Sequence, residues 1–196
     1  MSPMSGENAM PPTGPGVKLT YDDYLLFPED GQRHELIDGE HYVTPTPLLP
    51  HQRIVGNVYY AIRDYLETHP IGNVFVAPLD VILSKFDVVE PDLLYVSNER
   101  GKEIFGQWIH GAPDLAAEIA SPSTRKRDET TKRRLYERWN VVEYWTIDPE
   151  LEIVRLYRRG ESVFERPVEL SLEAGDVLTT TLLPGMELPL AKIFKE

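Results

Sequence analysis

Apolar residues recur along the chain with two different periods, which predicts a mixture of helices and strands. Between His51 and His69 they are spaced by three and four positions, as on the buried face of a helix. Around Asp38-Gly39 apolar and polar residues alternate, and this dipeptide favours the positive φ angles of a tight hairpin. Upstream, Thr20 can cap a short helix that ends at Pro28.

Three strands, a second helix and a further strand are predicted after the long helix. The strand segments are NVFVAPLDVILS, VVEPDLLYVS and PDLAAEIAS, with residues 98–113 as the loop before the last one. The segment TRKRDETTKRRLYERW then predicts a helix, VVEYWTID a strand, and residues 152–170 a hairpin that turns at Gly160-Glu161. The apolar segment LLPGMELPLAKIF is expected to close the core. This order indicates an α/β fold with β-hairpins added at both ends.

Length and composition favour one compact domain without a membrane segment. The chain has 196 residues, no cysteine and no shift in composition that would mark a second domain. Residues 1–18 lack the features of a signal peptide and are expected to form a disordered leader, followed by a single domain over residues 19–196. No apolar run approaches the ~20 residues of a membrane span, so the cytoplasm is the expected location.

The charge distribution is uneven. The formal net charge is -12, yet six basic residues lie within the ten positions from Arg125 to Arg134. The total charge argues against non-specific binding to nucleic acid, although local patches decide contacts. The sequence contains no Gly-rich phosphate loop and no zinc-like spacing of histidines.

Two carboxylates lie in sequence settings where a charge is costly. Asp92 follows Pro91 at the start of DLLYV, and Glu118 lies among small apolar residues in LAAEIA. Acids from neighbouring strands could share Mg²⁺, which takes few carboxylates, several waters and phosphate oxygens. Alternatively, Glu118 pairs with an arginine of the next helix and Asp92 caps a strand, and composition and spacing alone slightly favour this second interpretation.

The segments EPDLLYV and AAEIASPSTRKRDETTKRRLYERWNVVEYWTIDP together resemble the Uma-type endonucleases, a branch of the restriction-endonuclease-like PD-(D/E)XK superfamily. The resemblance spans roughly residues 19–149 and includes the segment HELIDGE and His51. It implies a restriction-endonuclease-like αβββαβ core with a mixed sheet. It further implies that Asp92 and Glu118, with the carbonyl of Ile119, bind the catalytic metal.

The sequence departs from the superfamily motif where a lysine is expected, because Ala120 stands two residues after the second acid. Either the chain is inactive or the following helix supplies the lysine, as Lys132 or Lys126. Spacings of four, four and three place four residues on one face of that helix: Asp128, Lys132, Tyr136 and Trp139. Lys132 could therefore reach back over the strand, or simply pair with Asp128.

Three further residues are candidates for the site. Glu35 matches an acid that the superfamily contributes from an early element, and it could hold the metal or a water, or bond within the hairpin. His51 could contact the scissile phosphate or cap its helix. Asp80 could be an additional metal ligand if its side chain faces the same cleft as the other acids.

The basic run after Glu118 is a candidate surface for nucleic acid. The predicted contacts to phosphates are Arg125, Lys126, Arg127, Arg133 and Arg134. The alternative is a solvated helix face balanced by Glu129 and Glu137.

The predicted function is Mg²⁺-dependent hydrolysis of phosphodiester bonds, with Mn²⁺ as a substitute ion and DNA as the expected substrate. A homodimer is expected, because cutting two strands with one site per chain calls for two copies. The alternative is a catalytically inactive nuclease fold that serves as a binding or regulatory module. A two-carboxylate glycosidase fits less well, because the basic helix favours a phosphate substrate over a neutral sugar.

Overall fold

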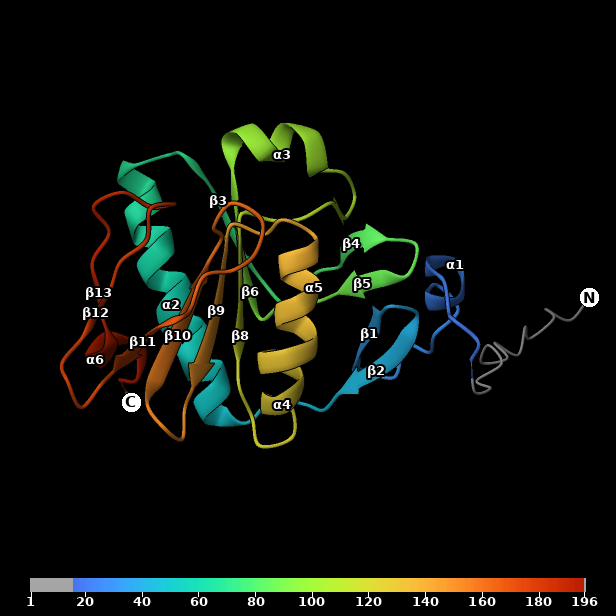
Figure 1. Cartoon of the computed structure of the whole chain (residues 1–196), viewed down its shortest axis with the longest axis horizontal. Helices are drawn as coiled ribbons and strands as arrows, with labels where there is room; N and C mark the ends of the chain where they lie inside the picture. The colour runs from blue at the N-terminus through green and yellow to red at the C-terminus, as the bar shows by residue number, and fades with distance from the viewer. Residues whose placement is uncertain (1–15, 196) are drawn as a thin grey trace, which may run out of the picture.

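The computed structural model describes residues 16–195, and its largest element is a six-stranded sheet (Figure 1). The strands lie in the order β11 (Val168–Ser171), β10 (Ile153–Arg158), β9 (Glu143–Asp148), β8 (Leu115–Ile119), β6 (Leu93–Ser97) and β3 (Gly72–Val76). Strands β8 and β9 run parallel, and the other neighbours run antiparallel.

Two helical segments complete the predicted αβββαβ order. Helix α2 (Leu49–Thr68) precedes β3. A continuous helical segment of α4 (Arg125–Arg127), the π-helical turn η1 (Asp128–Lys132) and α5 (Arg133–Arg138) joins β8 to β9. The parallel pair β8 and β9 requires such a crossover, because a tight turn can join only antiparallel strands. The predicted mixed α/β fold is confirmed.

The two helical segments cover opposite faces of the sheet, with α2 on one side and α5 on the other (Figure 1). Successive side chains of a strand point to opposite faces. Accordingly, Leu93 and Tyr95 of β6 pack in the core beneath α2, while Leu94 and Val96 pack in the core beneath α5. Because both faces are covered, β6 and β8 are apolar at almost every position.

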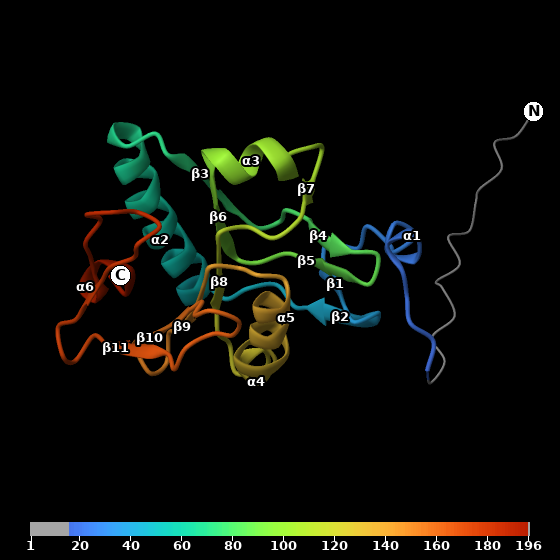
Figure 2. The same cartoon turned by 45° about the horizontal axis from the view of Figure 1, so that its top comes forward.

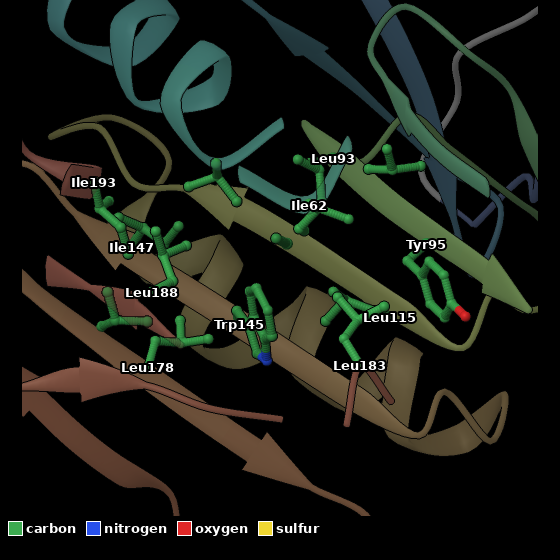
Figure 3. Close-up of a cluster of buried hydrophobic side chains, with 14 of the residues drawn as sticks. Ile62, Leu93, Tyr95, Leu115, Trp145, Ile147, Leu178, Leu183, Leu188 and Ile193 are labelled. Atoms are coloured by element: carbon green, nitrogen blue, oxygen red, sulfur yellow. The ribbon is translucent and has the colours of Figure 1, made fainter. Parts of the chain in front are cut away.

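The core beneath α2 also includes the C-terminal segment (Figure 3). Ile62 of α2 and Trp145 of β9 are fully buried in it. Short C-terminal elements cover its outer side: β12 (Val177–Leu178), β13 (Leu188–Pro189) and α6 (Leu190–Ile193). Leu188 and Ile193 of these elements are buried, as expected for a segment that closes the core.

A second sheet lies beside α5 and carries the N-terminal hairpin (Figure 2). Its strand order is β2 (Glu40–Thr44), β1 (Arg33–Ile37), β5 (Asp87–Val89), β4 (Val81–Ser84) and β7 (Ile109–His110). Asp38 and Gly39 turn the β1–β2 hairpin with φ angles of 54° and 76°. The predicted hairpin is confirmed, as is the one formed by β10 and β11.

Two predicted strands were wrong, since each is divided between the two sheets. Residues 73–84 cover most of β3 and all of β4, and residues 88–97 cover most of β5 and all of β6. Pro78 and Pro91 lie in the breaks. Proline has no N–H to donate to a ladder, so a continuous central strand is disfavoured at both places.

The predicted loop over residues 98–113 was also wrong. It contains helix α3 (Asn98–Ile104) and strand β7. The Ser97 side chain caps this helix by accepting a hydrogen bond from the Arg100 N–H, and Ile104 anchors it in the core. At the N-terminus, helix α1 (Tyr21–Tyr24) is capped by Thr20 as predicted, but it ends before Pro28.

The leader predicted over residues 1–18 lies outside the described residues except for residues 16–18. Across residues 16–195, no helix combines the length and the apolar character needed to cross a membrane.

Two leucines of α2 provide a test of the core. Leu66 is 4% exposed and Leu49 is 70% exposed. We expect Leu66→Ala to lower the free energy of unfolding by about 2–5 kcal/mol, because it opens a cavity in the core beneath α2. Leu49→Ala should change it by less than about 0.5 kcal/mol. Urea unfolding of both variants measures the difference, and equal losses would contradict the packing of α2.

Candidate active site

The register of β6 and β8 brings Asp92 and Glu118 together. Leu93 pairs with Ala117 and Leu94 with Ala116, so the next residues in this antiparallel register are Asp92 and Glu118. Residues opposite each other share a face of the sheet, with Cβ atoms about 4.5–5.5 Å apart. Both side chains are buried, each with 3% exposure. Two carboxylates thus lie side by side on the face that α5 covers.

Asp92 is held by three donors. Its Oδ1 accepts a hydrogen bond of 2.6 Å from Arg33, and its Oδ2 accepts one of 2.8 Å from the backbone N–H of Ile119. His51 Nε2 lies 3.0 Å from the same Oδ2. Burial raises the pKa of Asp92, but the bond from His51 and the charges of Arg33 and His51 outweigh it and hold the pKa at about 2. Asp92 is therefore ionised at neutral pH.

Glu118 is paired with a lysine from the neighbouring helix. Its Oε1 accepts hydrogen bonds of 2.8 Å from Lys132 Nζ and of 2.9 Å from the Tyr136 hydroxyl. Burial raises the pKa of the Glu118 carboxyl, with a contribution from the charge of Asp92, and the ammonium of Lys132 at 2.8 Å opposes this rise. Both hydrogen bonds fall on the same oxygen, so Oε2 takes part in neither.

Lys132 bridges two acids that come from different sheets. Its Nζ lies 2.8 Å from Glu118 Oε1 and 2.8 Å from Glu35 Oε1. Burial lowers the pKa of Lys132, but the charges of Glu118 and Glu35 raise it above its usual value, so the ammonium stays charged. The alternative partner, Asp128, forms no ion pair with Lys132 in the described part of the chain, although it is buried one helical turn away.

Glu35 is positioned by the hairpin. It lies in β1, where its Oε1 also accepts a hydrogen bond of 3.0 Å from the backbone N–H of Glu90. Its other oxygen is buried without a hydrogen bond, and the nearest guanidinium nitrogen, Arg127 Nη2, lies 3.7 Å away. Glu35 therefore gives the ammonium of Lys132 a second carboxylate partner, from the other sheet.

A cavity of about 530 Å³ opens over this cluster. Asp92, Glu118 and Lys132 line it together with His51. Most of the remaining lining comes from residues 44–48 and Pro50, before and at the start of α2, and from residues 119–124, at the end of β8 and before α4. The acids are thus buried in the sheet but reached from outside through this cavity, and Asp92 also lines a second cavity of about 360 Å³.

The other predicted site residues divide into two groups. Ile119 and Arg127 line the cavity. Asp80 does not line it and instead accepts a hydrogen bond of 2.7 Å from the Tyr24 hydroxyl. Four residues of the basic run also lie outside the lining: Arg125, Lys126, Arg133 and Arg134.

Several of these cations have acidic partners. Arg125 pairs with Asp148 and Glu150, at 2.8 Å in each case. Arg133 lies 3.5 Å from Glu137. Lys126 and Arg134 are exposed. The basic run is therefore partly neutralised within the fold.

Sequence reasoning did not single out Arg33, Asp128 or Tyr136 as site residues. Arg33 had a usable signal, because it lies two positions before Glu35 in β1 and so shares its face. Asp128 and Tyr136 were assigned to the face of the helix that carries Lys132, and both are buried there. Their contacts with the site depend on how the helix docks, which spacing alone does not determine.

The donor set suits a small hard cation. Carboxylate oxygens from two strands are the ligands that Mg²⁺ takes alongside water and phosphate oxygens. Within residues 16–195, no cluster of three or more His, Asp or Glu side chains is arranged to hold a metal. The bonds from Lys132 and Tyr136 both end on Glu118 Oε1, so Oε2 takes part in neither. Asp92 Oδ1 accepts a hydrogen bond from Arg33 and has a second lone pair that could bind a metal ion. A site of two carboxylates completed by water and substrate fits these residues.

The strand order and the two apposed acids define a restriction-endonuclease-like fold. Residues 21–191 match the Uma2 family, described as "Putative restriction endonuclease", and the chain belongs to this family. A solved structure described as "a putative nuclease belonging to DUF820 from Anabaena variabilis ATCC 29413" is similar in fold, with a TM-score of 0.77 and 20% sequence identity. The match covers 90% of this chain and 97% of the other. No curated protein matches the sequence.

The hydroxyl of Tyr136 tests the packing of the helix on the acids. We expect Tyr136→Phe to lower the free energy of unfolding by about 1–3 kcal/mol, because it removes a buried hydrogen bond to Glu118. Tyr60→Phe is the matched control, since this tyrosine is 70% exposed on α2. Thermal and urea unfolding measure both variants, and a neutral Tyr136→Phe would contradict the contact.

Proposed function

We propose that this protein is a Mg²⁺-dependent endonuclease that hydrolyses phosphodiester bonds, with DNA as its substrate. Membership of the family supports a nuclease. One observation carries the proposal. Asp92 and Glu118 lie opposite each other on neighbouring strands, and Lys132 Nζ lies 2.8 Å from Glu118 Oε1. Two acids that can hold a metal ion, with an ammonium beside them and a cavity open to the substrate, suit metal-assisted hydrolysis.

The position of Lys132 supports a lysine that has moved from the strand to the helix. The superfamily motif expects a lysine two residues after Glu118, where this chain has Ala120. Lys132 reaches the same acid from the helical segment that follows β8, and it also pairs with Glu35. Its ammonium can neutralise charge that develops on the phosphate in the transition state. We therefore assign Lys132 the role of the missing motif lysine.

Mg²⁺ would be held by Asp92, Glu118 and the carbonyl of Ile119, and when bound it would supply charge stabilisation and a more acidic water. Arg33 and His51 hold Asp92 ionised and in position through its two oxygens. Arg127 lines the same cavity and can bind a phosphate oxygen of the substrate. Glu35 orients Lys132 rather than contacting the ion.

Three further features belong to the same proposal. Lys126 and Arg134 are exposed and can contact phosphates beyond the cavity, which would steer a polyanion to an otherwise acidic protein. Two copies of the chain would be needed to cut both strands of a duplex, so a homodimer stays a prediction. A cytoplasmic location also stays a prediction.

A binding or regulatory module without catalysis is the second candidate. The hydrogen bonds of Asp92 favour this second candidate, because three donors already contact its two oxygens. Calorimetric titration with Mg²⁺ and Mn²⁺ separates the two candidates. Binding at millimolar concentration supports the endonuclease, and the absence of binding supports the module.

Removing either proposed ligand should abolish both metal binding and cleavage. We expect this of Asp92→Asn and of Glu118→Gln, because each removes a formal charge while keeping the shape of the side chain. Asp64→Asn is the control, since Asp64 is exposed on α2. Calorimetry and a DNA cleavage assay measure both properties. Retention of metal binding by both site variants would contradict the assignment.

Lys132→Met should separate metal binding from turnover. The change keeps the aliphatic stem but removes the ammonium, so the ion should still bind while the cleavage rate at saturating DNA falls by about 10²-fold or more. Lys126→Met is the matched control, because Lys126 is exposed in the same helical segment. If Lys126→Met loses turnover and Lys132→Met does not, the role of the lysine belongs to Lys126.

A further inference from the structure

We infer that the proposed nuclease cuts next to an unpaired base, and that this base enters the apolar part of the cavity beside Asp92 and Glu118. The inference rests on the proposed function and specifies its substrate: single-stranded or locally unpaired nucleic acid instead of continuous duplex. Three observations carry it, namely the walls of the cavity, the state of its cations and an exposed leucine at its rim.

The cavity has apolar walls that hydrolysis of a phosphate does not require. Two segments rich in proline approach each other across it, TPTPLLP over residues 44–50 and SPS over residues 121–123. The apolar lining residues are Pro45, Pro47, Leu48, Pro50, Ile119, Ala120, Pro122 and Pro149. Proline has a rigid ring with little rotamer freedom to lose, so such walls can hold a flat group at low entropic cost.

The size of the cavity suits one nucleotide unit. Its volume of about 530 Å³ falls within the range of about 300–1,000 Å³ that is usual for small-molecule sites. Because the cavity is continuous with the acids, its occupant must be the part of the substrate adjacent to the scissile phosphate. Of phosphate, sugar and base, only the base offers flat apolar faces to apolar walls. Enzymes that act on a nucleotide in a pocket commonly hold its base between apolar side chains.

Two of the three Lys and Arg side chains of the cavity are already closely paired with carboxylates, which leaves Arg127 for the scissile phosphate and disfavours tracking a duplex by its phosphates. Arg33 bonds to Asp92, and Lys132 bonds to Glu118 and Glu35. Arg127 donates a hydrogen bond of 2.8 Å to the Thr44 hydroxyl. Affinity for duplex DNA comes largely from many phosphate contacts, and the chain carries a net charge of -12. Contact with a base supplies affinity that does not depend on these cations.

Leu48 marks the rim of the cavity. It is 71% exposed although it lines the cavity, whereas its neighbour Leu49 is 70% exposed and does not line it. An exposed leucine beside a nucleic-acid site can pack against a base or enter a base step. The two leucines therefore form a matched pair with the same chemistry and exposure but different positions relative to the cavity.

The experiment compares cleavage of end-labelled DNA by the full chain with Mg²⁺ or Mn²⁺. The substrates are a single strand, the same strand in a continuous duplex, and the duplex with a short unpaired bulge. We expect cleavage within the single strand and at the bulge, and a rate at least about tenfold lower on the continuous duplex. Equal rates on duplex and single strand overturn the inference but leave the proposed function standing. No cleavage of any substrate overturns both the proposed function and the inference that rests on it.

An abasic substitution tests the base contact directly. Replacing the nucleotide next to the mapped cleavage position by an abasic analogue keeps the phosphate and sugar, and we expect cleavage to slow by about tenfold or more. An abasic site several nucleotides away is the control on the substrate. On the protein, Leu48→Ser should lower cleavage of the single strand and Leu49→Ser should not. An unchanged rate on the abasic substrate together with an unchanged Leu48→Ser variant would refute the base pocket.

Discussion

The buried charge of Glu118 is the constraint on which the rest of the site depends. A carboxylate inside an apolar strand is stable only if a cation and hydrogen bonds compensate it. Lys132 and the Tyr136 hydroxyl supply both from a helix that crosses the same face of the sheet. Lys132 is itself buried and needs a second acid, which Glu35 provides from the hairpin of the other sheet. One charge thus ties together a central strand, a crossover helix and the N-terminal hairpin.

The same arrangement explains how a site forms from distant segments. The antiparallel register of β6 and β8 aligns Asp92 with Glu118, so the two acids lie together without any special loop. The crossover between β8 and β9 must pass over one face of the sheet, and this brings Lys132 back above the strand that precedes it. The proposed hydrolysis also needs access for the substrate, which the segments around residues 44–50 and 119–124 leave open.

Much of the fold could be predicted from the sequence, because helix periodicity and the Asp38-Gly39 turn are local signals. The two strands divided at Pro78 and Pro91 could not, because assignment to one sheet or the other depends on long-range pairing. In the candidate site, Asp92 and Glu118 were singled out because their charges conflict with their surroundings, but only the resemblance to the Uma-type endonucleases favoured a metal-binding role over a structural one. Arg33 was missed, since its partner Asp92 lies 59 positions away in the sequence.

The most direct test of the account is a crystal structure with Mn²⁺, located by its anomalous scattering. The account predicts one ion between the carboxylates of Asp92 and Glu118, with Lys132 still hydrogen-bonded to Glu118. A map without an ion at this position, at a Mn²⁺ concentration that supports cleavage, would contradict the proposed centre. An ion bound elsewhere, with the two acids unchanged, would move the chemistry to that other place.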